Sequence, residues 1–202
     1  MLERIARHLG EGKLANALLL TEEEVKIVRN LHLLTMKPIL YILNKKQGAH
    51  NLDENDDSRF RELIEMFEAT NAHYVVVDAG VEHDLKDLEE DEKVEFRREY
   101  ATLDSGIDTL IRACYEKLGL ISYFTTGEKE TRAWTVERDS LAPKAAAAIH
   151  TDFEKKFIRA QVVTFADLVA AGSLARARET GKLRTEGKEY VVKDGDVIEF
   201  LI

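Results

Sequence analysis

Cysteine is nearly absent from this sequence, since Cys114 is the only one among 202 residues. A single cysteine can form no intramolecular disulfide and no cysteine-based zinc site. The sequence also has no run of 18 apolar residues, and its charged N-terminus has no apolar signal-peptide core. We therefore expect a cytoplasmic protein that neither spans a membrane nor is exported. We interpret Cys114 as a core residue on a helix rather than as a nucleophile.

The sequence also lacks the loop with which many enzymes hold nucleotide phosphates. In the spacing GxxxxGK[ST], backbone amides and the lysine cradle the phosphates and the hydroxyl binds magnesium. The nearest fragment contains Gly10, Gly12 and Lys13, but its glycine spacing is wrong and no Ser or Thr follows the lysine. We interpret it as a turn between helices, and we assign no catalytic residue.

Patterns of metal ligands are missing as well. The six histidines show no HxxxH or HxH pairing. Asp53, Asn55 and Asp57 are spaced as at the start of a calcium loop, but Ser58 stands where glycine is required and Ile64 where the bidentate glutamate belongs. We expect no metal site and interpret this segment as a helix cap.

Lys and Arg do not outnumber Asp and Glu in either part of the chain, residues 1–119 or residues 120–202. The net charge is −9, and all of it arises in residues 1–119, because residues 120–202 hold 13 Lys or Arg and 13 Asp or Glu. Non-specific wrapping of nucleic acid requires clustered Lys and Arg. We therefore expect no DNA partner, and contacts with RNA only through a local basic patch.

The first residues are predicted to form two helices, over 2–9 and 21–34, because their apolar residues recur at helical spacing. Thr21 is the expected N-cap of the second helix, and Glu24 stands at the capping-box position. The glycines at 10 and 12 interrupt the helical pattern between them.

Residues 39–43 and 74–77 are predicted strands, and the helix between them is capped by Asp57 or Ser58. A strand, a helix and a strand in this order predict a parallel pair in an α/β sheet. Another helix is expected over about 105–118. A parallel sheet is normally covered on both faces and has more than two strands, so we expect half of a domain to be missing.

Beyond residue 120 the pattern changes to short strands and turns. Asp194-Gly195-Asp196 is a hairpin turn signal between the last two of them. The arrangement predicts a small mixed sheet wrapped around a helix, of the β-grasp kind. The expected strands are 120–124, 131–136, 157–163, 190–193 and 197–201, and the expected helices are 143–149 and 165–171.

Several ordered segments resemble one known family. LGLISYFTTGEKETRAWTV, APKAAAAIHTDFEKKFIRAQVV, DLVAAGS and GKLRTEGKEYVVKDGDVIEF look like the TGS domain of YchF-type Obg-like ATPases, and LLTMKPILYILN looks like that family's return from its helical hairpin. The resemblance implies a partial helical hairpin over 1–36, a partial nucleotide-binding domain over 37–119 and a TGS domain over 120–202. It also implies that the complete family uses ATP and magnesium, that ribosomal RNA is a partner, and that an N-terminal half with the phosphate loop is missing here.

The resemblance further implies where the base of a nucleotide is recognised. Asn44-Lys45-Lys46-Gln47 stands at a strand end where GTPases have N-K-x-D and this family usually has N-x-x-E. The second element, often Ser-Ala-Lys, is here Asp78-Ala79-Gly80. A glutamine amide both donates and accepts, which suits adenine better than guanine. The candidate base-binding residues are Asn44, Lys45, Gln47, Asp78, Ala79 and Gly80; the alternative is two ordinary strand-end loops.

A set of basic residues lies near the C-terminus and could form one positive face. The sequence offers no aromatic pair for stacking on bases, so contacts would be mainly with phosphates and shape. The alternative is a scatter of charges over the surface. The candidate RNA- or ribosome-binding residues are Lys155, Lys156, Arg159, Arg176, Arg178, Lys182, Arg184 and Lys188.

Three functions follow from these observations. The first is a binding module of a ribosome-associated YchF-like protein that does not hydrolyse nucleotide, and needs no cofactor, on its own. The second is the C-terminal portion of a working ATPase, completed by an N-terminal half that carries the phosphate loop. The third is a regulatory ligand-binding TGS module.

Overall fold

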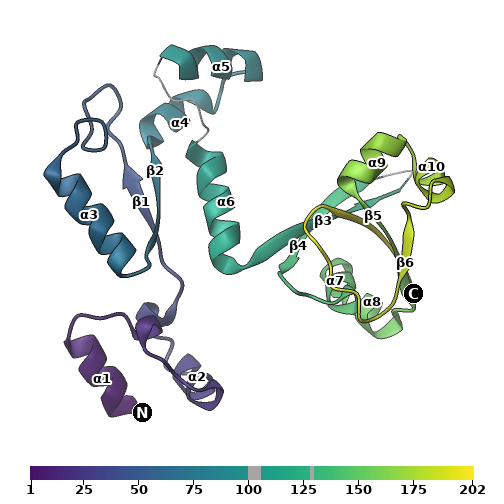
Figure 1. Ribbon diagram of the computed structural model, residues 1–202, viewed down its shortest axis with the longest axis horizontal. Coiled ribbons are helices and arrows are strands. Elements are labelled where there is room, and N and C mark those ends of the chain that lie inside the picture. The colour runs from purple at the N-terminus through teal and green to yellow at the C-terminus, as the bar shows by residue number, and fades with distance from the viewer. Residues whose placement is uncertain (100–105, 128–129) are drawn as a thin grey trace. The chain divides into compact units, whose positions relative to one another are not determined.

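The computed structural model describes residues 1–99, 106–127 and 130–202. The protein is an α/β protein with two compact units, Met1–Lys117 and Leu118–Ile202 (Figure 1). The division into three domains that the resemblance implied stays a prediction.

The first unit begins with two short helices, α1 (Leu2–Gly10) and α2 (Glu22–Arg29). Thr21 caps α2, and Glu24 returns the bond in a capping box, as predicted. The helix ends at Arg29 rather than at residue 34, because His32 adopts a φ of 50° and the chain then becomes extended. Two 3₁₀ turns, η1 (Ala15–Ala17) and η2 (Leu34–Met36), accompany the helices.

The predicted strand–helix–strand unit is present. Strands β1 (Leu40–Asn44) and β2 (His73–Val77) pair in parallel, and α3 (Ser58–Ala69) connects them. The Asp57 carboxylate accepts the backbone N–H of Arg59 and so caps α3. Parallel pairing brings the carboxyl ends of both strands to one edge of the sheet. The loops that follow β1 and β2 therefore start side by side.

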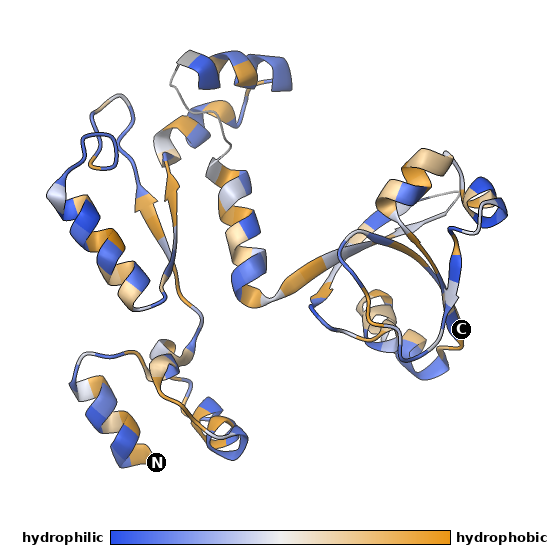
Figure 2. Cartoon of the chain, in the orientation of Figure 1, coloured by the Kyte–Doolittle hydropathy of each residue, from blue (hydrophilic) through white to orange (hydrophobic). Residues whose placement is uncertain are grey.

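The described residues of the first unit also form α4 (Ala79–Leu85), α5 (Glu90–Glu99) and α6 (Gly106–Leu118), whose last residue already belongs to the second unit. Figure 2 shows hydrophobic colour along β1 and β2 and mainly hydrophilic colour on α5. The expectation that Cys114 lies in a core is not met, because α6 has no fully buried residue and Cys114 is only half-buried. Residue 105, where the helix was expected to begin, lies outside the described residues.

The second unit contains, among its described residues, one mixed sheet with the strand order β4-β3-β7-β5-β6. The parallel pair β3–β7 joins an antiparallel hairpin to an antiparallel group, which gives the mixed sheet expected from the sequence. The strands are β3 (Leu120–Thr126), β4 (Thr131–Glu137), β5 (Arg159–Thr164), β6 (Arg184–Glu186) and β7 (Asp196–Leu201).

Helices cover both faces of this sheet. On one face, Tyr123 and Ile198 pack with Ala145 of α7 (Ala142–Ile149), beside α8 (Thr151–Lys156). On the other face, Val163 and Val197 pack with residues of α9 (Phe165–Ala171) and α10 (Leu174–Glu179). The helix predicted over 165–171 has the predicted bounds. Helix α10 lies in a segment that the sequence analysis did not assign to a helix.

The hairpin predicted between residues 190–193 and 197–201 is absent. Val191 forms an isolated bridge with Leu141 instead. The carboxylate of Asp196 explains the difference, because it accepts the backbone N–H of Lys193 (2.9 Å) and the hydroxyl of Tyr190 (2.7 Å). These bonds fold the segment into a turn and leave no ladder between it and β7.

Candidate functional site

The two loops of the candidate base-recognition edge meet at the carboxyl end of the parallel strands. The side-chain oxygen of Asn44 accepts the backbone N–H of Ala79 (3.0 Å). Asp78 caps α4 by accepting the backbone N–H groups of Gly80 (3.1 Å) and Val81 (3.0 Å). The residues that the sequence placed 35 positions apart are therefore held together by backbone and side-chain bonds.

Gln47 and Gly80 are in close contact within this edge. A Cβ atom on Gly80 would lie 2.7 Å from Oε1 and 3.1 Å from Cβ of Gln47. The amide nitrogen of Gln47 donates to a carboxylate oxygen of Asp84 on α4 (2.7 Å). The sequence analysis missed Asp84, because it stands 37 residues from Gln47 and belongs to no recognised motif.

Lys45 turns away from the base-recognition edge toward the following loop. Its ammonium group forms ion pairs with Asp53 (3.1 Å) and with Glu54. Partial burial acts to lower the pKa of Lys45, but hydrogen bonds with Glu54 and Asp53 outweigh it, so the pKa is raised. The pKa of Glu54 is lowered, chiefly by its hydrogen bond with Lys45.

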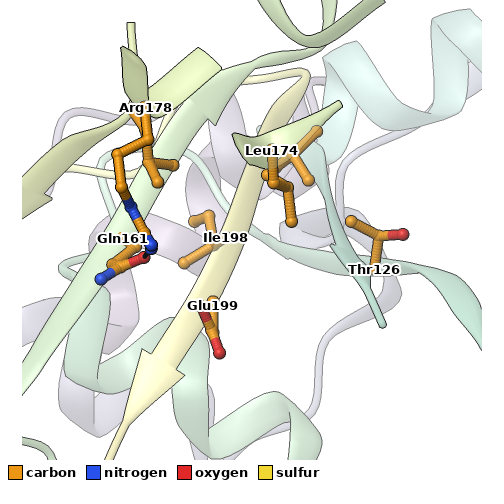
Figure 3. Close-up of a pocket in the computed structure, with 8 residues that line it drawn as sticks. Thr126, Gln161, Leu174, Arg178, Ile198 and Glu199 are labelled. Carbon is orange, nitrogen blue, oxygen red and sulfur yellow. Dashed lines mark hydrogen bonds between the residues drawn. The ribbon is translucent and has the colours of Figure 1, made fainter. Parts of the chain in front are cut away.

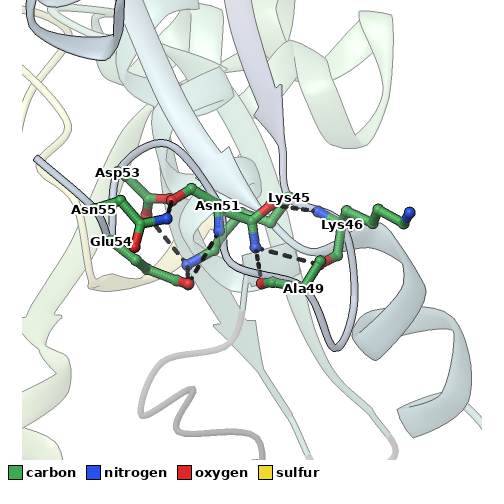
Figure 4. A network of polar contacts seen from close by, with 7 residues as sticks. All are labelled: Lys45, Lys46, Ala49, Asn51, Asp53, Glu54 and Asn55. Carbon is green, nitrogen blue, oxygen red and sulfur yellow. Dashed lines mark hydrogen bonds and ion pairs between the residues drawn. The ribbon is translucent and has the colours of Figure 1, made fainter. Parts of the chain in front are cut away.

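Asn51 closes the loop that contains these acidic residues (Figure 4). Its side-chain oxygen accepts the backbone N–H of Lys46 (2.7 Å), and its amide donates to the carbonyls of Ala49 (2.9 Å) and Lys46 (3.2 Å). Gly48 adopts a φ of 66°, which favours glycine in the turn. The loop is thus organised by its own side chains, a role for Asn51 that the sequence analysis missed.

The described ranges offer no group of three or more His, Cys, Asp or Glu side chains that could hold a metal ion. Asn44, Gln47 and Lys45 already have partners within the chain. Among the described residues this edge thus offers no ligand set for magnesium, and the sequence has no GxxxxGK[ST] loop for the phosphates.

The eight candidate ribosome-binding residues lie on separate elements of the second unit. Lys155 and Lys156 belong to α8, on the side of the sheet where α7 packs, whereas Arg176 and Arg178 belong to α10 on the opposite side. The structure therefore does not gather all eight on one face. Arg159 and Arg184 begin β5 and β6, and the remaining two residues, Lys182 and Lys188, lie outside the helices and strands.

Half of these eight residues already have partners. Arg178 donates to Gln161 (2.7 Å), and Lys182 pairs with Asp167 (3.1 Å). Arg184 pairs with Glu186 and donates to Tyr190, and Lys156 lies 4.0 Å from Asp152. Within the described residues, the other four make no side-chain hydrogen bond or ion pair, and all four are exposed: Lys155, Arg159, Arg176 and Lys188.

Among the described residues, no helix is both long and apolar enough to cross a membrane.

Comparison with protein families finds one model over the second unit. Residues 120–202 match YchF-GTPase_C, described as a protein of unknown function (DUF933). The chain is 44% identical over 200 residues to the ribosome-binding ATPase YchF of Bacillus subtilis (strain 168), which covers 99% of this chain and 54% of that protein. It is 42% identical over 202 residues to the protein of the same name from Escherichia coli O157:H7, covering 100% and 54%. The chain thus spans about half the length of these relatives.

Solved structures give a similar result. The YchF GTPase of Schizosaccharomyces pombe superposes with a TM-score of 0.83 at 30% identity, covering 98% of this chain and 53% of that one. A GTP binding protein from Pyrococcus horikoshii OT3 superposes with a TM-score of 0.55 at 18% identity, covering 83% and 46%. The second match concerns the fold alone.

Proposed function

Because this chain belongs to the YchF family and matches its C-terminal part, we propose that it is a ribosome-binding module whose second unit makes the main contact. Relatives with more than 40% identity over nearly the whole chain are named ribosome-binding ATPases, and this observation carries the proposal. We further propose that residues 120–202 form a TGS domain of the β-grasp kind and that 1–36 belong to a helical hairpin. A ribosome partner would place the protein in the cytoplasm.

The charge distribution supports the second unit as the contact. Exposed cations without an intramolecular partner are available to phosphates, and the second unit offers four among the candidate residues: Lys155, Arg159, Arg176 and Lys188. The first unit carries the acidic excess and would be repelled by RNA. Ribosomal RNA is therefore the proposed partner rather than ribosomal protein alone.

Co-sedimentation with ribosomes at low salt tests this function. We expect the 202-residue chain to pellet with ribosomes and to stay in solution without them. A chain that stays in the supernatant in both cases would contradict the proposal.

We also propose that the chain alone does not hydrolyse ATP or GTP. Its 202 residues contain no GxxxxGK[ST] sequence, so no lysine and hydroxyl are placed to stabilise the transferred phosphate. Phosphate release should equal the blank across the chromatographic peak of the purified chain. Turnover that follows this peak and survives further purification would contradict it.

A second candidate function is favoured by the meeting of the two strand-end loops. The bond between Asn44 and Ala79 assembles an edge that, in a protein with an N-terminal half, could contact the base of ATP. Titration with adenosine should then shift the amide resonances of Gln47 and Gly80 more than titration with guanosine. Equal or absent shifts would favour two ordinary loops.

A further inference from the structure

A row of polar side chains crosses the sheet of the second unit. Thr126 lies opposite Thr131, and Gln161 lies opposite both Glu199 and Thr185. Phe124 pairs with Val197 in parallel, so two residues further along, Thr126 stands beside Glu199. In spatial order the row is Thr131 (β4), Thr126 (β3), Glu199 (β7), Gln161 (β5) and Thr185 (β6).

The row marks the boundary of the part of the face that α9 and α10 cover. Phe124, Val197 and Val163 lie two residues away from row members along their strands, and they pack in the core beneath these helices. Residues two apart on a strand point to the same face, so the row shares this face with the core. Along these strands the row is thus the position at which the side chains on this face change from apolar to polar.

Arg178 of α10 reaches down onto this row (Figure 3). It donates to the side-chain oxygen of Gln161 (2.7 Å), which uses one of the donors of its guanidinium group and leaves others available. Thr126 and Thr131 are joined by a hydroxyl–hydroxyl bond of 2.8 Å. A hollow of about 30 Å³ lies between the row and Leu174, roughly the space of one water molecule.

Two charged side chains on this face have no partner among the described residues. Glu199 is exposed and makes no side-chain hydrogen bond or ion pair. Arg159 precedes Gln161 by two residues on β5, so it points to the same face, and it is also exposed and unpaired. The face thus presents guanidinium groups and a free carboxylate, together with neutral polar groups.

We propose that this row, flanked by Arg159 and Arg178, is a contact surface for single-stranded RNA; the inference rests on the proposed ribosome binding. Single-stranded RNA supplies both complements at once, since its phosphates pair with guanidinium groups and its unpaired base edges donate N–H groups to Glu199. Duplex RNA hides these base edges in its paired strands. An acidic peptide would satisfy the arginines but would bring its carboxylates close to Glu199.

The dimensions of the row suit an extended ligand. Neighbouring strands lie about 4.8 Å apart, so four intervals span roughly 19 Å. A polar strip of this length offers hydrogen bonds to several successive nucleotides. The sheet has no exposed aromatic residue in the row, so affinity should come from phosphate contacts and base-edge bonds rather than from stacking.

Fluorescence anisotropy with a labelled 12-nucleotide single-stranded RNA and the whole chain tests the proposal. Arg159→Ala and Arg178→Ala should each weaken binding about five- to tenfold and reduce the salt slope by about 1. Arg138→Ala removes an exposed arginine that follows β4 outside the row and makes no side-chain hydrogen bond or ion pair among the described residues, and it should change affinity less than twofold.

A second pair of variants adds charge without removing a cation. Thr185→Asp places a carboxylate in the row and should weaken binding, whereas Thr151→Asp at the start of α8 should not. Duplex RNA of the same sequence should bind more weakly than the single strand. Unfolded variants are recognised by their circular dichroism and are excluded from the comparison.

Three outcomes would overturn the inference. They are equal losses for Arg138→Ala and for the variants Arg159→Ala and Arg178→Ala, tighter binding of a poly-glutamate peptide than of the RNA, or preference for the duplex. If wild-type chain pellets with ribosomes but Arg159→Ala and Arg178→Ala pellet equally well, the row is not the contact and the proposed function stands. If the wild type does not pellet, the proposed function itself fails.

Discussion

In the second unit, the buried residue Asp196 determines the local backbone conformation through its hydrogen bonds. Asp196 is 1% exposed, yet its carboxylate is satisfied by the hydroxyl of Tyr190 and by the backbone N–H of Lys193. Burial, followed by the bond with Asp196, raises the pKa of Tyr190 to about 12. A buried carboxylate without its donors would be costly, so these bonds hold the turn in place.

Tyr190→Phe should therefore destabilise the second unit. The change removes one donor to a buried charge at nearly constant volume, and we expect a loss of about 1–3 kcal/mol in the free energy of unfolding. Urea unfolding monitored through Trp134, the only tryptophan, measures it. Tyr74→Phe, in the first unit, is the matched control and should leave this transition unchanged; equal midpoints for both variants and the wild type would contradict the role of Tyr190.

Because of Asp57, we expect the stability of α3 to depend on pH in the acidic range. Hydrogen bonds with Arg59 lower the pKa of Asp57 from 3.8 to about 2. A carboxylate whose pKa is depressed by folding stabilises the folded state above its unfolded pKa and loses that effect as pH falls toward 2.

The variant Asp57→Ala should thus be less stable than wild type at pH 7, and the difference should shrink between pH 4 and pH 2. Thermal unfolding by circular dichroism across this range measures it. Asp56→Ala removes a neighbouring, highly exposed carboxylate and should show no such trend. A difference that stays constant with pH would show that the cap bond does not carry the effect.

At the scale of elements, apolar periodicity was the useful signal. It predicted the parallel pair from 39–43 and 74–77 and the helix over 165–171, which the structure has as β1, β2 and α9. It missed β6, because Arg184-Thr185-Glu186 contains no apolar residue and is held only by pairing with β5. Apolar periodicity could not predict that residues 190–193 form no hairpin with β7, because this depends on the hydrogen bonds of the Asp196 side chain.

The sequence predicted the two loops of the candidate site but not all of the residues that hold them together. Strand ends located the loops that meet at Asn44 and Ala79, because parallel strands bring such loops to one edge. Asp84 and Asn51 were not predictable, since neither belongs to a motif and each acts through a bond that only the folded chain creates. The basic residues were identified by type, but their division between the two faces required the topology.

The parallel pair also predicts association. In the described part of the first unit the sheet consists of β1 and β2, so each strand has an unpaired edge, and Ile42 is 51% exposed. Unpaired edges pair readily with other chains. Sedimentation velocity should show association that grows with concentration, and Ile42→Lys should reduce it while Leu19→Lys, at the 94% exposed Leu19, should not. A strictly monomeric chain with slow amide exchange along both strands would contradict this.

At the scale of the whole molecule, the two units differ in charge and in proposed role. The acidic first unit contains the assembled base edge, and the second unit has balanced charge with unpaired cations on its surface. If the second unit carries the ribosome contact, binding should be electrostatic and should depend on a few of its basic residues.

Ribosome co-sedimentation across a salt series tests this account most directly. Wild-type retention should fall steeply with salt, because each phosphate contact releases counterions. Arg176→Glu with Arg178→Glu should lower affinity and flatten the slope, whereas Lys86→Glu with Lys93→Glu in the first unit should do neither. Retention that is insensitive to salt, or unchanged by the arginine pair, would contradict the account and move the contact away from the basic residues of the second unit.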